Sequence, residues 1–453
     1  ATEDVIAEVA EAGPDDIDRA VAAARQALTN GPWARMAGAE RGRILNRMAA
    51  LLRERLDEIV ELESLDGGKP VSATRRQDIP AAIDCLEYYA GWADKLVGDV
   101  IPTRRGAFTY TTLAPVGVVA AIVPWNFPLM NAVWKIAPAL ACGCTIVLKP
   151  AELTPLSALW LGAVALEAGL PPGVLNVLPG MGREAGAALV AHPGINKVSF
   201  TGSPRVGREI MRSAAENITR IGLELGGKAP NIVFGDADID AAVRQATSGA
   251  FFNAGQVCSA GTRILLANEI HDAFIERLRA RVATLRMGNP MNPSTSLGPV
   301  ISGPQMKRIL DYIDIGRQEG AVVVSGGERV GNRGYFIAPT IFTDVEGGMR
   351  IAQEEIFGPV VSVLRFHDED EALRLANGTP YSLAAAVWSR DIDRVHRVAE
   401  RLRAGTVWIN TYGPTDTRLP WGGTGGESGV GRDLGKAALE NYTEQKTVWL
   451  QLQ

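Results

Sequence analysis

The sequence predicts an α/β protein with two doubly wound α/β lobes and a small additional β element. Apolar, β-branched strands alternate with amphipathic helices through most of the chain, and glycine-containing turns repeatedly follow the strands. A chain of 453 residues is also too long for one simple hydrophobic core, so two or three lobes are expected.

The N-terminal part is predicted to be largely helical. Residues 15–30 begin with two aspartates and then place apolar side chains at helical spacing. A second helix is expected from about 40 to 65, because the glycines and proline of 66–70 end it. A third is expected over about 79–96.

From residue 107 the pattern changes to strands followed by turns and helices. The β-rich segment 108–113 and the apolar run 116–123 are expected strands, and 124–128 is a loop that begins and ends with proline. Further strands are expected at 145–148, 174–177 and 197–200, each leading through a turn into a helix. Ligands of such parallel sheets bind at the carboxyl ends of the strands.

A second lobe is predicted after the linking segment 221–228. Residues 236–252 read as a helix, and strands are expected near 263–267, 321–325 and 360–366. The tail 441–453 ends in an alternating strand, and an exposed terminal strand usually joins another sheet, often in a partner subunit.

Composition excludes several classes of function. Hydrophobic residues make up 46% and charged residues 21%, which is ordinary for a globular protein. A net charge of −5 without a long basic run argues against nucleic acid as a partner. The longest apolar runs contain proline and fall short of a membrane span, so no membrane partner is expected.

Cysteine usage indicates the compartment. Four cysteines in 453 residues do not form a disulfide framework, which favours a reducing environment. The N-terminus is acidic and shows no signal-peptide pattern. We therefore expect a cytoplasmic protein.

Cys258 is the strongest candidate for a reactive group. It lies in a run of small and polar residues, whereas a thiol needed only for packing is more often surrounded by Leu, Ile and Val. Residues 255–258 read as a turn that presents the thiol at its tip. A thiolate is a strong nucleophile, and a positive dipole end or a nearby base activates it.

The other sequence motifs do not indicate a binding or catalytic site by themselves. The glycines of 180–186 are spaced one residue too widely for the dinucleotide fingerprint, and the P-loop-like segment 222–229 ends in Ala229, which cannot bind Mg²⁺ through a hydroxyl. The four histidines are scattered, so no metal site is expected. Cys142 and Cys144 lie in an apolar passage that favours packing.

Two polar residues could assist Cys258. Glu224 stands in an apolar, glycine-rich setting, and burial there would raise its pKa toward that of a general base working near neutral pH. A solvated linker carboxylate is the alternative. Asn126 could donate its side-chain N–H to a developing oxyanion, or it could simply be a turn residue before Pro128.

Six short motifs occur together in one order, and they make the chain resemble the NAD(P)-dependent aldehyde dehydrogenases over nearly its whole length. They are Pro124-Trp-Asn-Phe-Pro128, Lys149-Pro-Ala-Glu152, Phe200-Thr-Gly-Ser203, Leu223-Glu-Leu-Gly-Gly-Lys228, Gly255-Gln-Val-Cys258 and Glu354-Glu-Ile-Phe-Gly-Pro359. Any one motif is modest evidence, but their order and spacing together are highly specific.

The resemblance implies a mechanism and a division into domains. Cys258 matches the family's nucleophile, which forms a thiohemiacetal and then a thioester. Asn126 matches the oxyanion donor, and Glu224 matches the base that activates water. Residues 1–96 and 116–227 would form a Rossmann-like NAD-binding domain and 228–440 the catalytic domain. Residues 97–115 and 441–453 would form an oligomerisation element of a homodimer or homotetramer.

The resemblance also implies binding residues. NAD is the expected cofactor, with NADP as the alternative, because a carboxylate at Glu152 would repel a 2′-phosphate. The matching cofactor positions are Trp125, Lys149, Glu152, Gly182, Gly186, Phe200, Thr201, Gly202, Ser203, Val206, Leu225, Gly226, Glu355 and Phe357. The matching substrate positions are Phe127, Asn131, Trp134, Phe252, Thr415 and Trp421.

These positions favour an aliphatic or aromatic aldehyde, although aromatic walls also suit the quaternary ammonium of betaine aldehyde, and a semialdehyde is a further alternative. Two rival classes on the same fold are a CoA-acylating enzyme and a non-catalytic structural protein. Members of the family usually have Lys in the loop that matches Pro420–Gly429, which here lacks it and is one residue longer.

Overall fold

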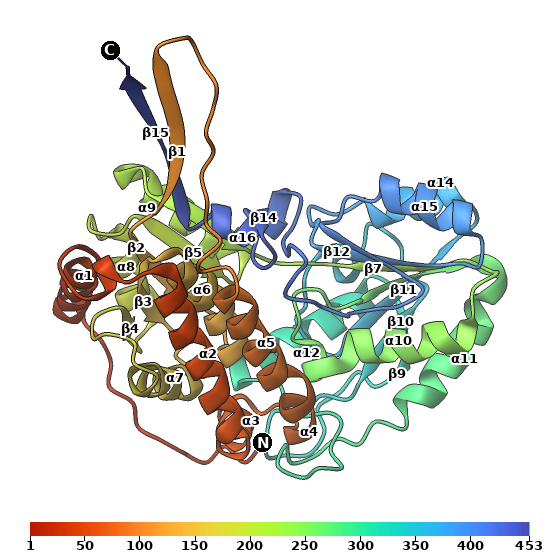
Figure 1. The fold of residues 1–453 in the computed structure, drawn as a ribbon. Coiled ribbons are helices and arrows are strands. Elements are labelled where there is room, and N and C mark those ends of the chain that lie inside the picture. The colour runs from red at the N-terminus through yellow and green to blue at the C-terminus, as the bar shows by residue number, and fades with distance from the viewer. Residues whose placement is uncertain (453) are drawn as a thin grey trace.

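The computed structural model describes residues 1–452, which form two α/β lobes and a projecting two-stranded ribbon (Figure 1). The first lobe is built on a six-stranded sheet with the strand order β14-β6-β5-β2-β3-β4. The bounds of its strands are β2 Val118–Ile122, β3 Thr145–Lys149, β4 Leu175–Val177, β5 Lys197–Thr201, β6 Arg220–Glu224 and β14 Gly429–Val430.

All strands of this sheet run parallel except β14, which pairs antiparallel with β6. The central strands β2 and β3 are mainly apolar and almost wholly buried, as expected for a parallel sheet covered by helices on both faces. The helices of the lobe are α1 Pro14–Thr29, α2 Gly38–Glu54, α3 Leu56–Gly67, α4 Val71–Ala73, α5 Ile79–Ala90, α6 Pro128–Cys142, α7 Leu156–Glu167, α8 Ala187–Ala191 and α9 Pro204–Asn217.

The long helix expected over 40–65 is in fact α2 and α3. Arg55 breaks it with φ −113° and ψ 31°, values outside the helical region. The expected helix 79–96 ends at Ala90. A π-helical turn, Thr74–Asp78, precedes α5 and places Asp78 inside the lobe.

The second lobe contains a seven-stranded sheet with the order β13-β12-β7-β8-β11-β10-β9, in which only β9 runs antiparallel. Its strands are β7 Pro230–Val233, β8 Arg263–Ala267, β9 Val322–Ser325, β10 Thr340–Thr343, β11 Val360–Phe366, β12 Ala384–Trp388 and β13 Thr406–Ile409. Its helices are α10 Ile239–Phe251, α11 His271–Val282, α12 Gly303–Gln318, α13 Arg350–Gln353, α14 Glu369–Ala376 and α15 Ile392–Arg401.

The chain returns to the first lobe before residue 440, which differs from the expected boundary of the second lobe. Strand β14 closes the edge of the first sheet beside β6. The short helix α16, Ala437–Glu440, packs against α6, and its Ala438 belongs to the same hydrophobic core as that helix. Residues 429–440 therefore belong structurally with the first lobe.

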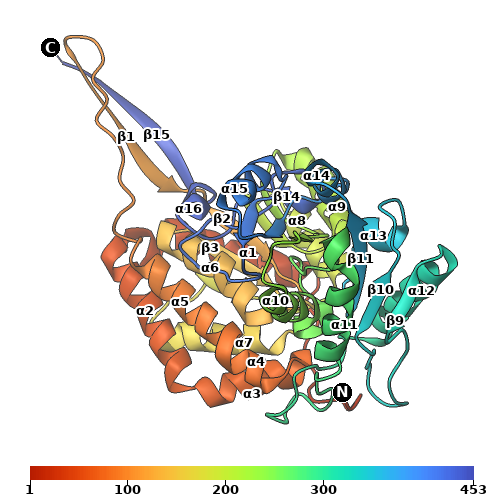
Figure 2. The same ribbon diagram turned by 90° about the vertical axis from the view of Figure 1, so that its right-hand side faces the viewer.

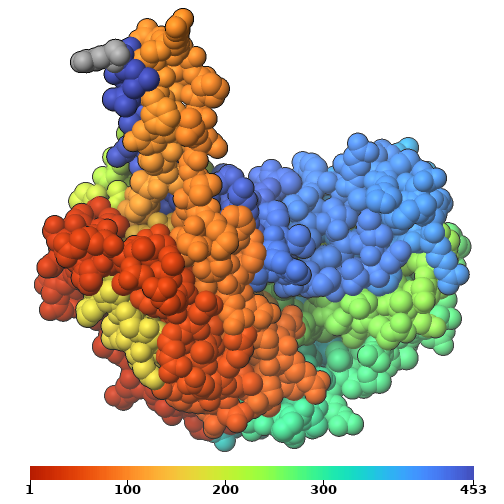
Figure 3. Space-filling view, in the orientation of Figure 1, coloured from red at the N-terminus to blue at the C-terminus, as the bar shows by residue number. Residues whose placement is uncertain are grey.

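The ribbon consists of β1, Ala107–Pro115, and β15, Thr443–Gln451, paired antiparallel along their full length. The C-terminal strand thus pairs within its own chain. Figures 2 and 3 show the ribbon standing clear of the body of the molecule. It exposes large apolar side chains, among them Phe108, Trp449 and Leu450.

Candidate active site

A cavity of about 930 Å³ lies between the lobes and is lined by residues of both. From β2 the chain builds outward through β3 and β4 and then crosses back to β5 on the other side of β2. Such a reversal leaves a crevice at the carboxyl ends of the two strands, where α/β proteins bind nucleotides. The segments 124–127 and 201–205, which follow β2 and β5, line the cavity.

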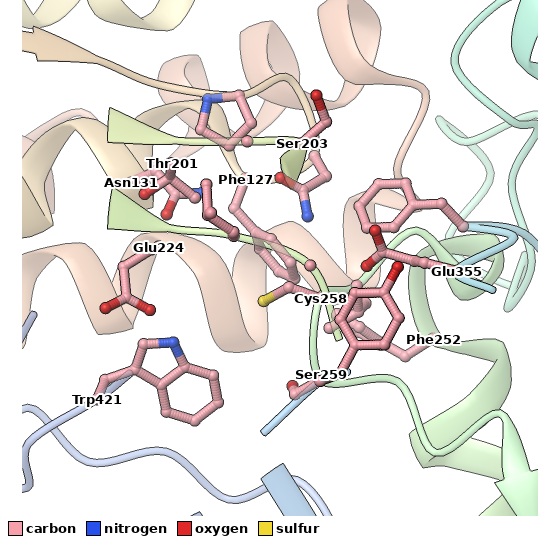
Figure 4. Close-up of a pocket in the computed structure, with 18 of the residues that line it drawn as sticks. Phe127, Asn131, Thr201, Ser203, Glu224, Phe252, Cys258, Ser259, Glu355 and Trp421 are labelled. Atoms are coloured by element: carbon pink, nitrogen blue, oxygen red, sulfur yellow. The ribbon is translucent and has the colours of Figure 1, made fainter. Parts of the chain in front are cut away.

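Cys258 lies on the loop after α10, and its side chain reaches the cavity (Figure 4). The chain turns sharply because Asn253 and Ala254 are both left-handed, with φ of 49° and 53°. This conformation costs energy in non-glycine residues and persists only where other contacts enforce it. The Gln256 side chain supplies two such contacts, donating to the Asn253 carbonyl at 2.9 Å and accepting from the Ile301 N–H at 2.8 Å.

The thiol is not activated in the free site. Burial, together with smaller contributions from the carboxyl groups of Glu355 and Glu224, raises the pKa of Cys258 to about 12. The group is therefore a neutral thiol at neutral pH. The first reason is burial of the thiol, and the second is that the neighbouring ionisable groups are carboxyl groups rather than cations.

Gly227, in the segment 222–229, packs against the loop that carries Cys258. A Cβ on Gly227 would lie 2.0 Å from the Cys258 carbonyl oxygen, so only glycine fits there. Gly227 also donates its N–H to Glu355 Oε1 at 3.0 Å. The P-loop-like spacing thus reflects close packing around the cysteine loop and Glu355, in agreement with the absence of a P-loop predicted from Ala229.

Asn126 joins the two loops that meet at the cavity. Its Nδ2 donates to the Gln256 carbonyl at 2.9 Å, and Asn253 Nδ2 donates to the Asn126 carbonyl at 3.0 Å. These contacts use one of the two hydrogens on Asn126 Nδ2. The residue is thereby a positioning group for the cysteine loop and still lines the cavity.

Glu224 ends β6 and turns its carboxyl group into the same cavity as Cys258 (Figure 4). Its pKa is raised well above the usual range, first by burial and then by the charge of Asp433. Its Oε2 has no hydrogen-bond partner among residues 1–452. A Cβ on Gly422, where φ is 143°, would lie 2.5 Å from Glu224 Oε1, so the glycine-rich loop directly covers this carboxyl group.

Sequence reasoning missed the buried ion pair behind Glu224. Lys135 Nζ and Asp433 Oδ2 lie 3.0 Å apart, and both side chains are buried and belong to residues far apart in the sequence. A signal was present: Lys135 is the only charged residue in α6, a helix whose residues are all buried. A buried ammonium requires a charged partner, although the sequence does not show which one.

The residues expected to hold the cofactor form two groups. Trp125, Thr201, Gly202, Ser203, Leu225, Gly226, Glu355 and Phe357 line the cavity. Lys149, Glu152, Gly182, Gly186, Phe200 and Val206 lie outside its lining.

Most of the second group gathers near the end of β3, the strand beside β2. Lys149 Nζ contacts Glu152 Oε2 at 3.0 Å, and a Cβ on Gly186 would lie 3.8 Å from Lys149 Cδ. Phe200 is buried in the core, and a Cβ on Gly202 would lie 2.4 Å from its ring. Phe200 thus supports the turn that carries Gly202, and its ring does not face the cavity.

The crevice has the features that a dinucleotide needs. Ser203 caps the N-terminus of α9 through a 3.4 Å bond from the Val206 N–H, so the positive end of a 14-residue helix faces the cavity. The buried Thr201 Oγ1 has no partner among residues 1–452. Arg205 and Arg208 also line the crevice, where they form ion pairs with Glu209 and Glu427. These groups fit the phosphates and ribose of a bound nucleotide.

The lengthened glycine-rich loop closes one side of this crevice. Ser428 Oγ donates to the Gly226 carbonyl at 2.8 Å and accepts from the Ser382 N–H at 2.8 Å. Glu427 forms an ion pair with Arg208 of α9. The loop without the family's usual lysine is thus held to both lobes by other contacts.

Aromatic side chains line the part of the cavity beyond Cys258. The rings of Phe127 and Phe252 are nearly parallel, with centroids 6.2 Å apart, and those of Trp134 and Trp421 meet edge to face at 6.1 Å. All six expected substrate positions, Phe127, Asn131, Trp134, Phe252, Thr415 and Trp421, line the cavity. Figure 4 shows Phe127, Asn131, Phe252 and Trp421 around the cysteine and Glu224.

Neither a metal cluster nor a membrane-spanning helix occurs in the part of the chain that the structure describes. Within residues 1–452, no group of three or more His, Cys, Asp and Glu side chains is arranged to hold a metal ion. In the same residues, no helix has both the length and the apolar character needed to cross a membrane.

Comparison with known proteins now identifies the family. The family model described as "Aldehyde dehydrogenase family" matches residues 1–448. An aldehyde dehydrogenase from Emericella nidulans is 51% identical over 451 residues, covering 99% of this chain and 90% of the relative.

Solved structures show the same relationship. The NAD⁺ complex of an aldehyde dehydrogenase from Bacillus cereus has a TM-score of 0.99 and 48% identity, covering 100% of this chain and 92% of that chain. An indole-3-acetaldehyde dehydrogenase from P. syringae, solved with NAD⁺, has a TM-score of 0.97 and 45% identity, with coverage of 100% and 92%. The chain belongs to the aldehyde dehydrogenase family.

Proposed function

We propose that this protein oxidises an aldehyde to its carboxylic acid with NAD⁺, through a thioester on Cys258. The observation that carries the proposal is that one cavity contains the Cys258 thiol, the Glu224 carboxyl group and the nucleotide crevice of β2 and β5. The family membership and the two NAD⁺-bound relatives support the same activity.

Cys258 is the nucleophile in this proposal. Its thiol loses a proton, and the sulfur attacks the aldehyde carbon to form a thiohemiacetal. Because burial raises the pKa of Cys258 to about 12, attack requires a base that takes this proton. Water in the cavity carries this proton away, and Glu224 acts only in the later hydrolysis step. Asn126 and the Cys258 N–H orient the carbonyl oxygen and stabilise its negative charge.

NAD⁺, when bound, supplies the acceptor for the hydride that leaves the thiohemiacetal. Ser203 and the N-terminus of α9 would hold its phosphates, and Glu355 with Phe357 would hold its nicotinamide half. Gly226 and Gly227 position the Glu355 carboxyl group. A Cβ on Gly226 would lie 2.8 Å from Glu355 Oε2, and the Gly227 N–H donates to Glu355 Oε1. Lys149 and Glu152 at the end of β3 would hold the adenosine ribose, and the Glu152 carboxylate disfavours NADP⁺.

Glu224 then activates water to hydrolyse the thioester. Its raised pKa suits a group that takes a proton from water near neutral pH, because a strongly acidic carboxylate would hold that proton too weakly. The presence of this carboxyl group beside the thiol favours water over coenzyme A as the acceptor of the acyl group.

The substrate is proposed to be an aliphatic or aromatic aldehyde of broad range. The cavity beyond Cys258 is walled mainly by the rings of Phe127, Trp134, Phe252 and Trp421, and apolar walls bind apolar chains. The P. syringae relative is named for indole-3-acetaldehyde, which carries an aromatic ring. Betaine aldehyde is the alternative, because aromatic rings also attract quaternary ammonium groups.

Location and assembly complete the proposal. All four cysteines are free, as expected in a reducing compartment such as the cytoplasm. The exposed apolar ribbon of β1 and β15 is proposed to pair with another copy of the chain in a homodimer or homotetramer.

The test is NADH formation from NAD⁺ with aliphatic, aromatic, semialdehyde and betaine aldehydes. The wild type should turn over, Cys258→Ala should form no NADH, and Glu224→Gln should give one burst of NADH and then stall. Cys142→Ala, which changes a buried thiol outside the cavity, is the matched control and should stay active. Activity of Cys258→Ala, or turnover that requires coenzyme A, would contradict the proposal.

A further inference from the structure

A buried cluster of charged side chains lies beside the aromatic part of the cavity. Glu63, Lys69 and Asp78 are each at most 3% exposed, and Lys69 Nζ forms an ion pair with Asp78. Glu63 Oε1 accepts a hydrogen bond from the Leu129 N–H in the first turn of α6 at 3.2 Å. The cluster is thus attached to the helix that carries Asn131 and Trp134 into the cavity.

Lys69 contacts the rings that wall the cavity. Its ammonium lies 3.6 Å from the centroid of the Phe127 ring and 5.8 Å from that of Phe252. Both distances are within the range of cation–π attraction, which is stronger for a desolvated ammonium than for an exposed one. One lysine therefore holds both of these rings.

The ammonium lies behind the wall and not in the cavity. Phe127 and Phe252 line the cavity, whereas Lys69 is absent from its lining. The two rings are inclined by only 20° to each other with centroids 6.2 Å apart, and this near-parallel pair, called here the Phe127–Phe252 platform, lines the cavity while Lys69 does not. The partner carboxylate, Asp78, is held on the same hidden side by the π-helical turn 74–78.

We propose that Lys69 is a positioning residue that fixes the Phe127–Phe252 platform and thereby sets which aldehydes the enzyme prefers. The inference rests on the proposed aldehyde oxidation. An aldehyde long enough to reach the platform gains from rings held in one orientation, because it does not pay to order them on binding. A small aldehyde does not reach them and gains nothing.

The charge behind the rings also selects against cations. The π-faces of the platform already interact with a positive charge, and a quaternary ammonium on the cavity side would be repelled by it across the ring. Asp78 reduces this repulsion without placing any negative charge in the cavity. Lys69 therefore makes the site prefer neutral aldehydes to betaine aldehyde.

The experiment compares substrates within each variant. The double variant Lys69→Met/Asp78→Asn removes both charges of the buried pair, so that neither is left uncompensated. Lys307→Met/Asp311→Asn makes the same change in an exposed pair of α12, whose atoms lie 2.7 Å apart, and is the matched control. The substrates are propanal, benzaldehyde, betaine aldehyde and its neutral analogue 3,3-dimethylbutanal, and thermal unfolding is recorded for each protein.

The expected result is a change in the kinetic preference of the enzyme for one aldehyde over another. In the buried double variant, KM for benzaldehyde should rise about tenfold, because the substrate must then order two rings that Lys69 no longer holds, while KM for propanal changes by less than about twofold. The wild type should prefer 3,3-dimethylbutanal to betaine aldehyde by about tenfold, and the variant should narrow this preference. Lys69→Arg, which keeps the charge, should retain the wild-type ratios.

Two outcomes overturn the inference. An equal loss for propanal and benzaldehyde would show that the pair only stabilises the fold. A wild type that prefers betaine aldehyde would contradict it without any variant, even if the double variant does not fold. Failure of the proposed function is distinguishable, because the wild type would then oxidise none of the four aldehydes.

Discussion

Cys258 owes its low intrinsic reactivity to the same packing that positions it. Its loop presses on Gly227, is fixed by Gln256, and faces the carboxyl groups of Glu355 and Glu224. Burial and like charge both favour the neutral thiol. A nucleophile that stays protonated until its ligands arrive is protected from oxidation and alkylation, which require the thiolate.

The pH dependence of alkylation tests this state of Cys258. A folded-state pKa of about 12 means that the thiolate fraction grows with pH throughout the accessible range. The rate of Cys258 modification by iodoacetamide in the free enzyme should therefore rise about tenfold per pH unit between about pH 6 and 9. The rate is measured by mass spectrometry of the Cys258 peptide.

Cys142 is the internal control for that measurement. It is buried at the end of α6, outside the cavity, so it should remain unmodified while the protein is folded. A Cys258 rate that levels off below about pH 8 would show a thiol with an ordinary or lowered pKa and would contradict the effect of burial.

Placement at the cavity was predictable for residues that stand in a local motif. Cys258, Glu224 and Asn126 all reach one cavity, and each stands in a short motif that the family resemblance identified. The roles of Lys69 and of the Lys135–Asp433 pair were not predicted. Lys69 contacts aromatic rings, and Lys135 pairs with a carboxylate that is distant in the sequence. The shift of the Cys258 pKa depends likewise on burial, which no local pattern reveals.

At the scale of elements, the N-terminal caps of α9 and α10 can be compared to separate helix capping from cofactor binding. Ser203 caps α9 by accepting from the Val206 N–H at 3.4 Å, and Asp238 caps α10 by accepting from the Ala241 N–H at 2.9 Å. Both side chains satisfy a backbone N–H that the helix cannot. Only the start of α9 faces the cavity.

Replacing each cap by alanine should therefore give different results. Ser203→Ala and Asp238→Ala should each lower the free energy of unfolding by about 1 kcal/mol, measured by urea denaturation. Ser203→Ala should also raise the dissociation constant of NADH about fivefold, the effect of one lost hydrogen bond, in a fluorescence titration. An equal effect of both changes on NADH binding would mean that Ser203 acts only as a cap.

Element order was predictable, and element pairing was less so. Alternating apolar strands and amphipathic helices encode much of the two parallel sheets locally, so the strands expected between 108 and 366 appeared within about two residues of their positions. Strand β6 lies in the segment expected to be a link, and β7, β10, β12 and β13 had no expected range. Arg55 divided an expected helix, and β14 joined the first sheet after about 200 intervening residues. Long-range pairing of short strands leaves no local signal, because the partner sets it.

At the scale of the whole molecule, the proposed homo-oligomer would cover the exposed ribbon of β1 and β15. A two-stranded antiparallel ribbon is marginal in water by itself. Its strands are far apart in the sequence, with Phe108 paired in register to Leu450, and both side chains are exposed. Exposed apolar groups on an open sheet edge favour pairing with a further strand or packing against another surface.

Leu450→Glu should weaken the assembly without unfolding the body of the protein. The wild type is expected to sediment at micromolar concentration as a multiple of its 48.3 kDa chain, and the variant should shift toward a single chain because a carboxylate is costly to bury in an apolar interface. Ile392→Glu, the same chemical change at a residue of α15 that is 64% exposed, is the matched control and should sediment as the wild type. A wild type that sediments as a single chain, or a Leu450→Glu variant with unchanged assembly, would show that the ribbon is stable uncovered and that its apolar residues serve another purpose.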